Sequence, residues 1–311
     1  MHPTRVLLFD ADNKWPNLAL MKLAAHHRAR GHEVVLNAPL FGPFDRVHAS
    51  CVFPKNRWRV ESLPFHDVEA GGSGWDLETV LPPDVERLQP DYSLYGINWS
   101  LGFTSRGCPR RCPWCIVPEK EGDIEPWASI YEFWDPRHRK IVLLDNNLLA
   151  SPNWRETLEA LERENLMVDF NQGLDIRLLT EENARLLAKL HFKRLRFAFD
   201  QPSDEREVRR AIRTLNGATI PTSRLSFYVL TNFNTTLTQD LARVRILTSL
   251  GVNQVFVMIY GEADRLHREL QRWACHPYMR KYWTFEQWLK YRGVPLCRPL
   301  HEIGLARQMP G

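Results

Sequence analysis

This sequence has few cysteines, no long apolar run, no internal repeat and no large excess of either charge. Its 311 residues include only six cysteines, too few for a disulfide-stabilised scaffold. No apolar stretch approaches the roughly 20 residues that span a membrane, so we expect no membrane partner. The apolar run VLLF (6–9) is too short for a signal peptide. These absences predict a cytoplasmic protein.

The residues that are present give an ordinary globular composition. The apolar fraction is 44% and the charged fraction is 25%, enough for one large domain or two smaller ones with a substantial core. The formal net charge of +4 is mildly basic. It permits a polyanionic partner without requiring one.

The N-terminal part predicts a small parallel sheet. RVLLFD (5–10) and EVVLN (33–37) are short apolar strands, and the segment between Asn17 and Gly31 has the pattern of a capped helix. A strand, a helix and a second strand in this order are typical of a parallel α/β domain. The region from about 40 to 100 looks irregular.

Six predicted strands alternate with helical segments from residue 99 onward. Apolar residues in the helical segments recur at intervals of three and four. Such alternation is typical of an open parallel sheet or a barrel. The predicted strands are 99–105, 141–145, 167–171, 194–200, 225–231 and 254–261.

Polar side chains follow five consecutive predicted strands. Active sites of parallel α/β barrels lie at the C-terminal ends of the strands, so several of these residues are candidates for a site. Taken singly, each is better explained as a helix cap or a turn, and the recurrence at five consecutive strands is what favours a site. The residues are Asp145, Asn146, Asn147, Asn171, Gln172, Asp200, Gln201, Thr231, Asn232, Tyr260 and Glu262.

Three of the six cysteines lie in one segment, GFTSRGCPRRCPWCIVPEKEG (102–122). Cys108, Cys112 and Cys115 have the spacing Cys-x3-Cys-x2-Cys, which brings three thiolates to one metal centre. Three ligands suit a four-iron cluster with one iron open to an external ligand. The alternative is a zinc site completed by a distant His or Cys. Three nearby arginines favour thiolates and a negative cluster, namely Arg106, Arg110 and Arg111.

This motif, placed after a first barrel strand and with Trp114 before the third cysteine, resembles the radical S-adenosylmethionine (SAM) superfamily. The resemblance covers about residues 99–262 and implies a partial (β/α)6 barrel. It implies that Cys108, Cys112 and Cys115 hold a [4Fe-4S] cluster whose open iron binds SAM. One electron then cleaves SAM to methionine and a 5′-deoxyadenosyl radical, which abstracts a substrate hydrogen. An external electron donor of the flavodoxin or ferredoxin type is also implied.

The resemblance also suggests SAM contacts at the strand ends. The family's second strand usually ends in a Gly-Gly-Glu-like segment, whereas this chain has LLDNN (143–147). In NQGLDIRLL (171–179), Asp175 and Arg177 resemble ribose and carboxylate contacts, although a structural ion pair explains them equally well. The candidate cofactor contacts are Trp114, Asp145, Asn147, Gln172, Asp175, Arg177 and Asp200, and the catalytic candidates are Asp200 and Tyr260.

The N-terminal segment resembles the Rossmann-like cobalamin-binding domain of one radical SAM branch. Its turn DADNKWPN (10–17) lacks the histidine that ligates cobalt there, so we expect no cobalamin. The predicted domains are 1–98, Rossmann-like; 99–262, partial barrel; and 263–311, a basic and aromatic helical extension. We expect a monomer or a dimer.

A modified nucleic-acid base is the favoured substrate, for example in the remodelling of a hypermodified thymidine in phage DNA. The barrel mouth would hold the base, lined by Asn146, Gln172, Asp200, Asn232 and Tyr260. The extension would contact the strand, although its aromatic residues have a helical spacing that equally predicts packing onto the barrel. Its candidate contacts are Arg272, Trp273, Arg280, Lys281, Tyr282, Trp283, Trp288, Lys290 and Arg292.

Three other functions are compatible with the same motif. The radical enzyme can act on a peptide or a small metabolite, or it can be a cobalamin-type methyltransferase. A non-enzymatic iron-sulfur protein is the third alternative, and the polar residues at the strand ends argue against it.

Overall fold

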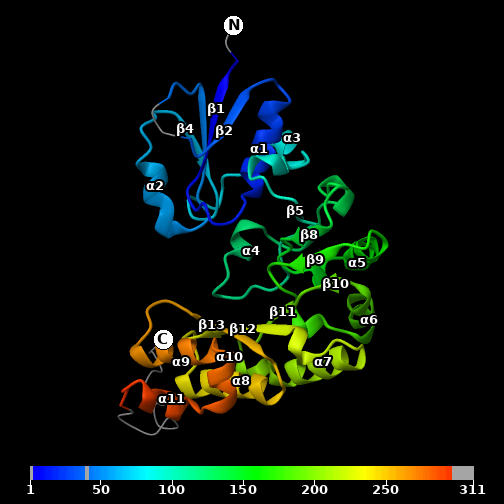
Figure 1. Ribbon diagram of the computed structural model, residues 1–311, viewed down its shortest axis with the longest axis vertical. Coiled ribbons are helices and arrows are strands. Elements are labelled where there is room, and N and C mark those ends of the chain that lie inside the picture. Colours follow the sequence, from blue (N-terminus) through cyan, green and yellow to red (C-terminus); the bar gives the residue numbers. More distant parts are fainter. Residues whose placement is uncertain (1–2, 39–41, 296–311) are drawn as a thin grey trace. The chain divides into compact units, whose positions relative to one another are not determined.

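The computed structural model describes residues 3–38 and 42–295 (Figure 1). The chain forms two compact units, 1–146 and 147–311. The boundary between these units falls inside the stretch that the sequence assigns to one barrel. Both units are mixed α/β with parallel sheets, so the predicted α/β class is confirmed.

The first unit begins with a four-stranded parallel sheet in the order β2-β1-β3-β4. Two of these strands occupy the region that the sequence predicts to be irregular, and that prediction is wrong. RVHAS and VEAG are short and partly polar, so neither has the apolar run of a buried strand. The strands are β1 (Arg5–Asp10), β2 (Glu33–Leu36), β3 (Arg46–Ser50) and β4 (Val68–Gly71).

Helix α1 (Leu18–Arg28) covers one face of this sheet. The Asn17 side chain accepts a hydrogen bond from the Leu20 N–H at 3.1 Å, which confirms the predicted N-cap. Leu20 and Ala24 are buried one turn apart and pack against β1. Two short helices follow in this unit, α2 (Arg57–Glu61) and α3 (Pro83–Glu86).

The remainder of the first unit carries the cysteine segment. Strand β5 (Ser100–Gly102) pairs in parallel with β8 (Lys140–Leu143), and the short strands β6 (Ser105–Arg106) and β7 (Glu125–Pro126) pair antiparallel. Helix α4 (Val117–Lys120) follows the third cysteine. The cysteines therefore lie between the two strands of a small ribbon.

The second unit contains the remaining predicted strands. Strand β9 (Met167–Phe170) pairs in parallel with the short β10 (His191–Phe192). A separate parallel sheet has the order β11-β12-β13, with β11 (Leu195–Ala198), β12 (Leu225–Thr231) and β13 (Gln254–Ile259). The helices between the strands are α5 (Trp154–Arg163), α6 (Glu181–Lys189), α7 (Glu205–Gly217) and α8 (Leu237–Ser249).

The β11-β12-β13 sheet has one buried face and one open face. Helices α7 and α8 lie along the same side of it in Figure 1. Along β13, Val255 and Val257 are buried whereas Phe256 and Met258 are exposed. This alternation is the period of two that a strand with one covered face requires.

The C-terminal segment is helical as far as it is described. Its helices are α9 (Arg265–Ala274), α10 (Pro277–Tyr282) and α11 (Phe285–Tyr291). Trp273 is 2% exposed and Trp288 is 9% exposed, so these two indoles pack inside, as the alternative interpretation of the segment predicts. In the described part of the chain, none of the helices is long and apolar enough to cross a membrane.

Candidate functional site

The cysteine loop is closed tightly at its base. The β6–β7 pair and a hydrogen bond from the Cys108 N–H to the Gly122 carbonyl, at 3.2 Å, join its two ends. Gly107 has a φ of +74°, and a Cβ atom there would lie 2.1 Å from the Asp123 carbonyl oxygen. Only glycine fits both conditions, so the backbone that enters the motif is fixed.

A backbone N–H group donates to the sulfur of Cys108 and another to the sulfur of Cys115. The Arg110 N–H donates to the Cys108 Sγ at 3.4 Å, and the Val117 N–H donates to the Cys115 Sγ at 3.5 Å. Cys108 and Cys112 are half-buried, whereas Cys115 is exposed. N–H donors to sulfur stabilise thiolates and tune iron-sulfur clusters.

These thiols fit an iron-sulfur cluster in the chemistry of their donor set. Three soft sulfur ligands lie within eight residues, and two of them already accept backbone N–H bonds. Among residues 3–38 and 42–295, no three His, Cys, Asp or Glu side chains are grouped as they would be around a metal ion. The loop therefore offers the ligands, and their convergence on a cluster remains a prediction. Cys297 lies outside the described residues.

Arg106 braces the loop. Its guanidinium contacts Glu121 at 2.9 Å and Glu86 at 2.7 Å, and it lies 4.1 Å from the centre of the Phe103 ring. Lys22 of α1 contacts the same Glu86 carboxylate at 2.8 Å. Two carboxylates therefore balance the Arg106 charge, which leaves less of it to offset a cluster than the sequence suggests.

Asp145 holds the backbone that leads into the loop. Its buried carboxylate accepts hydrogen bonds from the backbone N–H and the hydroxyl of both Thr104 and Ser105, at 2.6 to 3.2 Å. Burial raises the pKa of Asp145, although these donors act in the opposite direction. Its observed role is to position residues 104 and 105.

Three candidate cofactor contacts meet in the second unit. The Asn147 side-chain N–H donates to the Asp175 carboxylate at 3.2 Å, and the Arg177 guanidinium contacts that carboxylate at 2.8 Å. Asp175 also caps the short helix η5 (Ile176–Leu178). Asp175 and Arg177 therefore form the ion pair that the sequence suggests as the alternative to a SAM contact. The cluster nevertheless combines an amide, a carboxylate and a guanidinium in one place.

The other candidates are more dispersed. The Asp200 carboxylate accepts from the Leu230 N–H at 2.9 Å, and burial raises its pKa. Gln172 is exposed. Asn146 and Trp114 are half-buried.

The turn after β13 is held by Asn232. Its side-chain N–H groups donate to the Tyr260 carbonyl at 2.9 Å and to the Glu262 carbonyl at 2.8 Å. The Tyr260 ring is exposed and meets Phe233 edge-on, with 4.8 Å between the ring centres. The Asn232 side chain therefore fixes a turn that carries an accessible aromatic ring.

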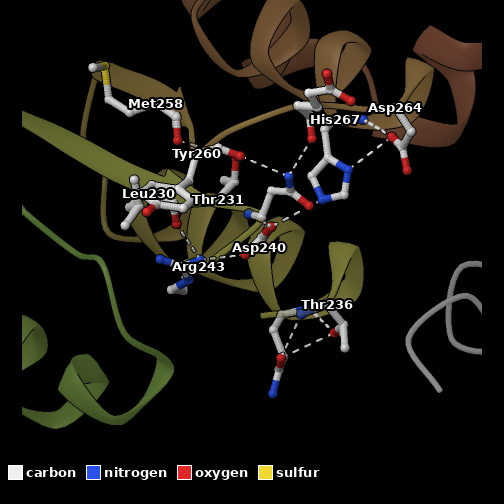
Figure 2. Close-up of polar contacts among 12 residues, drawn as sticks. Leu230, Thr231, Thr236, Asp240, Arg243, Met258, Tyr260, Asp264 and His267 are labelled. Carbon is white, nitrogen blue, oxygen red and sulfur yellow. Dashed lines mark hydrogen bonds and ion pairs between the residues drawn. The ribbon is translucent and has the colours of Figure 1, made fainter. Parts of the chain in front are cut away.

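A buried charged network lies beside this turn, and the sequence patterns do not reveal it (Figure 2). His267 lies between two carboxylates, 2.9 Å from Asp264 and 3.5 Å from Asp240. The Asp240 carboxylate also contacts Arg243 at 2.5 Å, and Arg243 donates to the carbonyls of Phe199, Asp200 and Leu230. The network joins α8, α9 and the ends of β11 and β12.

Opposing effects set the charge of this histidine. Burial alone would lower the pKa of His267, but its close contacts with Asp240 and Asp264 and the charges of both carboxylates raise it. The imidazolium is therefore favoured beside Asp240. Close to the network, a shallow groove of about 670 Å³ is lined by Met258, Ile259, Gly261, Glu262, Ala263, Arg268 and Gln271.

Comparison with known proteins adds no family to these observations. Neither a family model nor a curated protein matches this chain.

Proposed function

We propose that this protein is a radical SAM enzyme that acts on a modified base in nucleic acid. The proposal includes a partial (β/α)6 barrel formed by the strands between residues 99 and 262. The observation that carries it is the closed cysteine loop, in which backbone N–H groups donate to the sulfurs of Cys108 and Cys115. A loop with three thiols and no room for a side chain at Gly107 is suited to one rigid metal centre.

In this proposal Cys108, Cys112 and Cys115 hold a [4Fe-4S] cluster. When bound with SAM and reduced by an external flavodoxin or ferredoxin, the cluster supplies the electron that yields a 5′-deoxyadenosyl radical for hydrogen abstraction. The residues of this chain hold and shape the site. Arg106 fixes the base of the loop from Glu86 and Glu121, and Asp145 fixes the two residues that precede it.

The cluster of Asn147, Asp175 and Arg177 is the proposed contact for SAM. Its amide and guanidinium are donors for a carboxylate, and its carboxylate is an acceptor for ribose hydroxyls or an amino group. Asp200 and Tyr260 are the proposed contacts for the substrate. The half-buried Asp200 has a raised pKa, which suits a group that holds or moves a proton.

Anaerobic reconstitution with iron and sulfide tests this function. We expect about four iron atoms per chain, a brown chromophore, and SAM cleavage with dithionite as the reductant. Cys108→Ala, Cys112→Ala and Cys115→Ala, singly and together, should lose the chromophore and the cleavage. Cys275→Ala is the matched control, because Cys275 is exposed and lies outside the loop.

Two results would overturn the proposal. One is full iron content in the triple alanine variant, provided that circular dichroism confirms its fold. The other is stoichiometric zinc in strictly anaerobic wild-type protein with no iron uptake, which would favour the alternative zinc site.

A further inference from the structure

Exposed aromatic side chains gather in two loops of the first unit. One follows β1 and carries Trp15, which is 49% exposed. The other follows β3 and carries Phe53, which is 54% exposed, and it leads into helix α2, which carries Trp58, 62% exposed. Large exposed aromatic rings are typical of a binding surface where they lie close together.

These two loops flank the topological switch point of the sheet. The chain passes from β1 to β2 on one side, and β3 and β4 lie on the other side of β1. In open parallel α/β sheets, ligands bind beyond the C-terminal ends of the strands at the point where the strand order reverses. The exposed rings therefore lie at the edge where such a fold binds ligands.

The loop after β3 is held rigidly although its rings are exposed. The Asp12 carboxylate accepts hydrogen bonds from the backbone N–H groups of Val52 and Phe53 and from the Asn56 side chain, at 2.6 to 3.3 Å. A Cβ atom at Gly74 would lie 2.5 Å from the Phe53 backbone, so the segment after β4 packs closely against the loop after β3. The protein thus fixes the backbone that presents Phe53 to solvent, which lowers the entropic cost of binding.

Cations alternate with the aromatic rings. The segment FPKNRWR (53–59) carries three basic residues, of which Arg57 pairs with Glu61 at 2.9 Å and Arg59 donates to the Ala11 carbonyl. The Lys55 ammonium lies 5.7 Å from the centre of the Phe53 ring, and Lys14 precedes Trp15. The nearby Asp12 carboxylate is already bonded to its three donors. The surface therefore presents apolar rings and positive charge together.

The C-terminal extension is less suited to the same partner than its sequence suggests. Arg280 is buried and donates to the carbonyls of Ala274, Val252 and Asn253. Trp273 and Trp288 are buried as well. These three residues are therefore lost to packing, whereas Tyr278, Tyr282 and Tyr291 stay exposed.

We propose that the surface formed by Lys14, Trp15, Phe53, Lys55 and Trp58, the switch-point surface, binds single-stranded nucleic acid. Bases stack on the exposed rings and the lysines contact the phosphates, a combination that is tolerant of sequence. A duplex hides the faces of its bases and gains only the contacts to the lysines. This inference rests on the proposed function, which supplies nucleic acid as the class of substrate. It adds the surface that would bind the strand.

Fluorescence anisotropy with a labelled oligothymidylate of about 12 nucleotides, using the full chain at low salt, tests the inference. Trp58→Ala and Phe53→Ala should each weaken binding roughly tenfold, the loss expected when one stacked base is released. Lys55→Gln should reduce the slope of log Kd against log salt by about 0.7, the value for one phosphate contact on a single strand. A duplex of equal length should bind more weakly than the single strand.

Tyr131→Ala and Lys193→Gln are the matched controls, because both residues are exposed and neither belongs to a proposed site. These variants should bind as the wild type does. Wild-type affinity in Trp58→Ala and Phe53→Ala, or tighter binding of the duplex, would overturn the inference. So would a dimer that Trp58→Ala converts to a monomer, because the surface would then belong to a second copy of the chain.

Iron content and SAM cleavage, measured on the same variants, separate the two proposals. Strand binding at this surface without an iron-sulfur cluster would overturn the proposed function and leave the surface in place. Cluster assembly with no dependence of binding on Phe53 or Trp58 would overturn the surface alone.

Discussion

Two buried histidines, one in each unit, have opposite electrostatic surroundings. His27 is 3% exposed and lies among other imidazoles, with its Nε2 atom 2.9 Å from His48 and its Nδ1 atom 3.0 Å from His32. His267 is 7% exposed and lies between Asp240 and Asp264. Burial is nearly equal, so the neighbouring groups decide the charge of each ring.

The pKa values move in opposite directions as a result. Burial, and then the neighbouring His48, lower the pKa of His27 to about 4, so this ring is neutral at pH 7. Burial also acts to lower the pKa of His267, but the two carboxylates outweigh it and raise the value. His27 therefore stabilises the fold above its unfolded-state pKa near 6.5, whereas His267 does so below it.

Asp240→Ala should have the largest effect on this comparison. Asp240 is fully buried and faces both Arg243 and His267, so its loss leaves two cations without their shared carboxylate. Breaking a buried ion pair in this way costs about 3 to 5 kcal/mol. Urea unfolding followed by circular dichroism measures the change. An effect as small as that of a surface substitution would show that the network is weakly coupled to the fold.

His27→Gln should change how stability depends on pH. In the wild type, stability should decline as the pH falls from 6.5 toward 4, because the unfolded chain takes up a proton that folded His27 resists. Each unit of this pKa difference corresponds to about 1.4 kcal/mol. The variant should have a shallower decline in acid, measured as urea midpoints from pH 7 to pH 4.

A control variant for His27→Gln must leave the cluster of imidazole rings around His27 intact. The groups that face it are His26, His32 and His48, with Arg46 nearby, and His48 in turn contacts Glu69 at 3.3 Å. Arg46→Gln removes one positive charge near His27 without removing an imidazole ring. Most of the decline in stability at acid pH should therefore remain in this variant. Equal pH profiles for wild type and His27→Gln would place the acid dependence in other groups.

Much of the fold follows from local patterns. Strands β1 and β12 coincide with the predicted segments 5–10 and 225–231, because each contains a run of four apolar or aromatic residues, VLLF (6–9) and FYVL (227–230). Strand β3 was not predicted because its His48 and Arg46 interrupt the apolar pattern. The buried histidine is satisfied by partners that come from elsewhere in the chain, which no local pattern indicates.

The candidate site also has one part that the local sequence predicts and another that depends on contacts between distant residues. The cysteine loop is local, so its spacing alone predicts a shared metal centre. The brace on Arg106 comes from Glu86, 20 residues away, and Asp240 meets His267 across 27 residues. Asp240 and Arg243 look like an ordinary surface pair on a helix until the fold buries them. Long-range burial is the information that the sequence patterns lack.

Asp264→Asn should have the smallest effect and should sharpen the comparison. Asp264 contacts His267 but is itself exposed, so the change should cost less than about 1 kcal/mol of stability at pH 6. The amide oxygen introduced by this substitution still accepts from the His267 N–H as a helix cap, so the main loss is one negative charge beside the ring. The pKa of His267 should fall, and the alkaline loss of its stabilising contribution should begin at a lower pH. Titration of the His267 ring by NMR measures this directly, and an unchanged midpoint would assign the raised pKa to Asp240 alone.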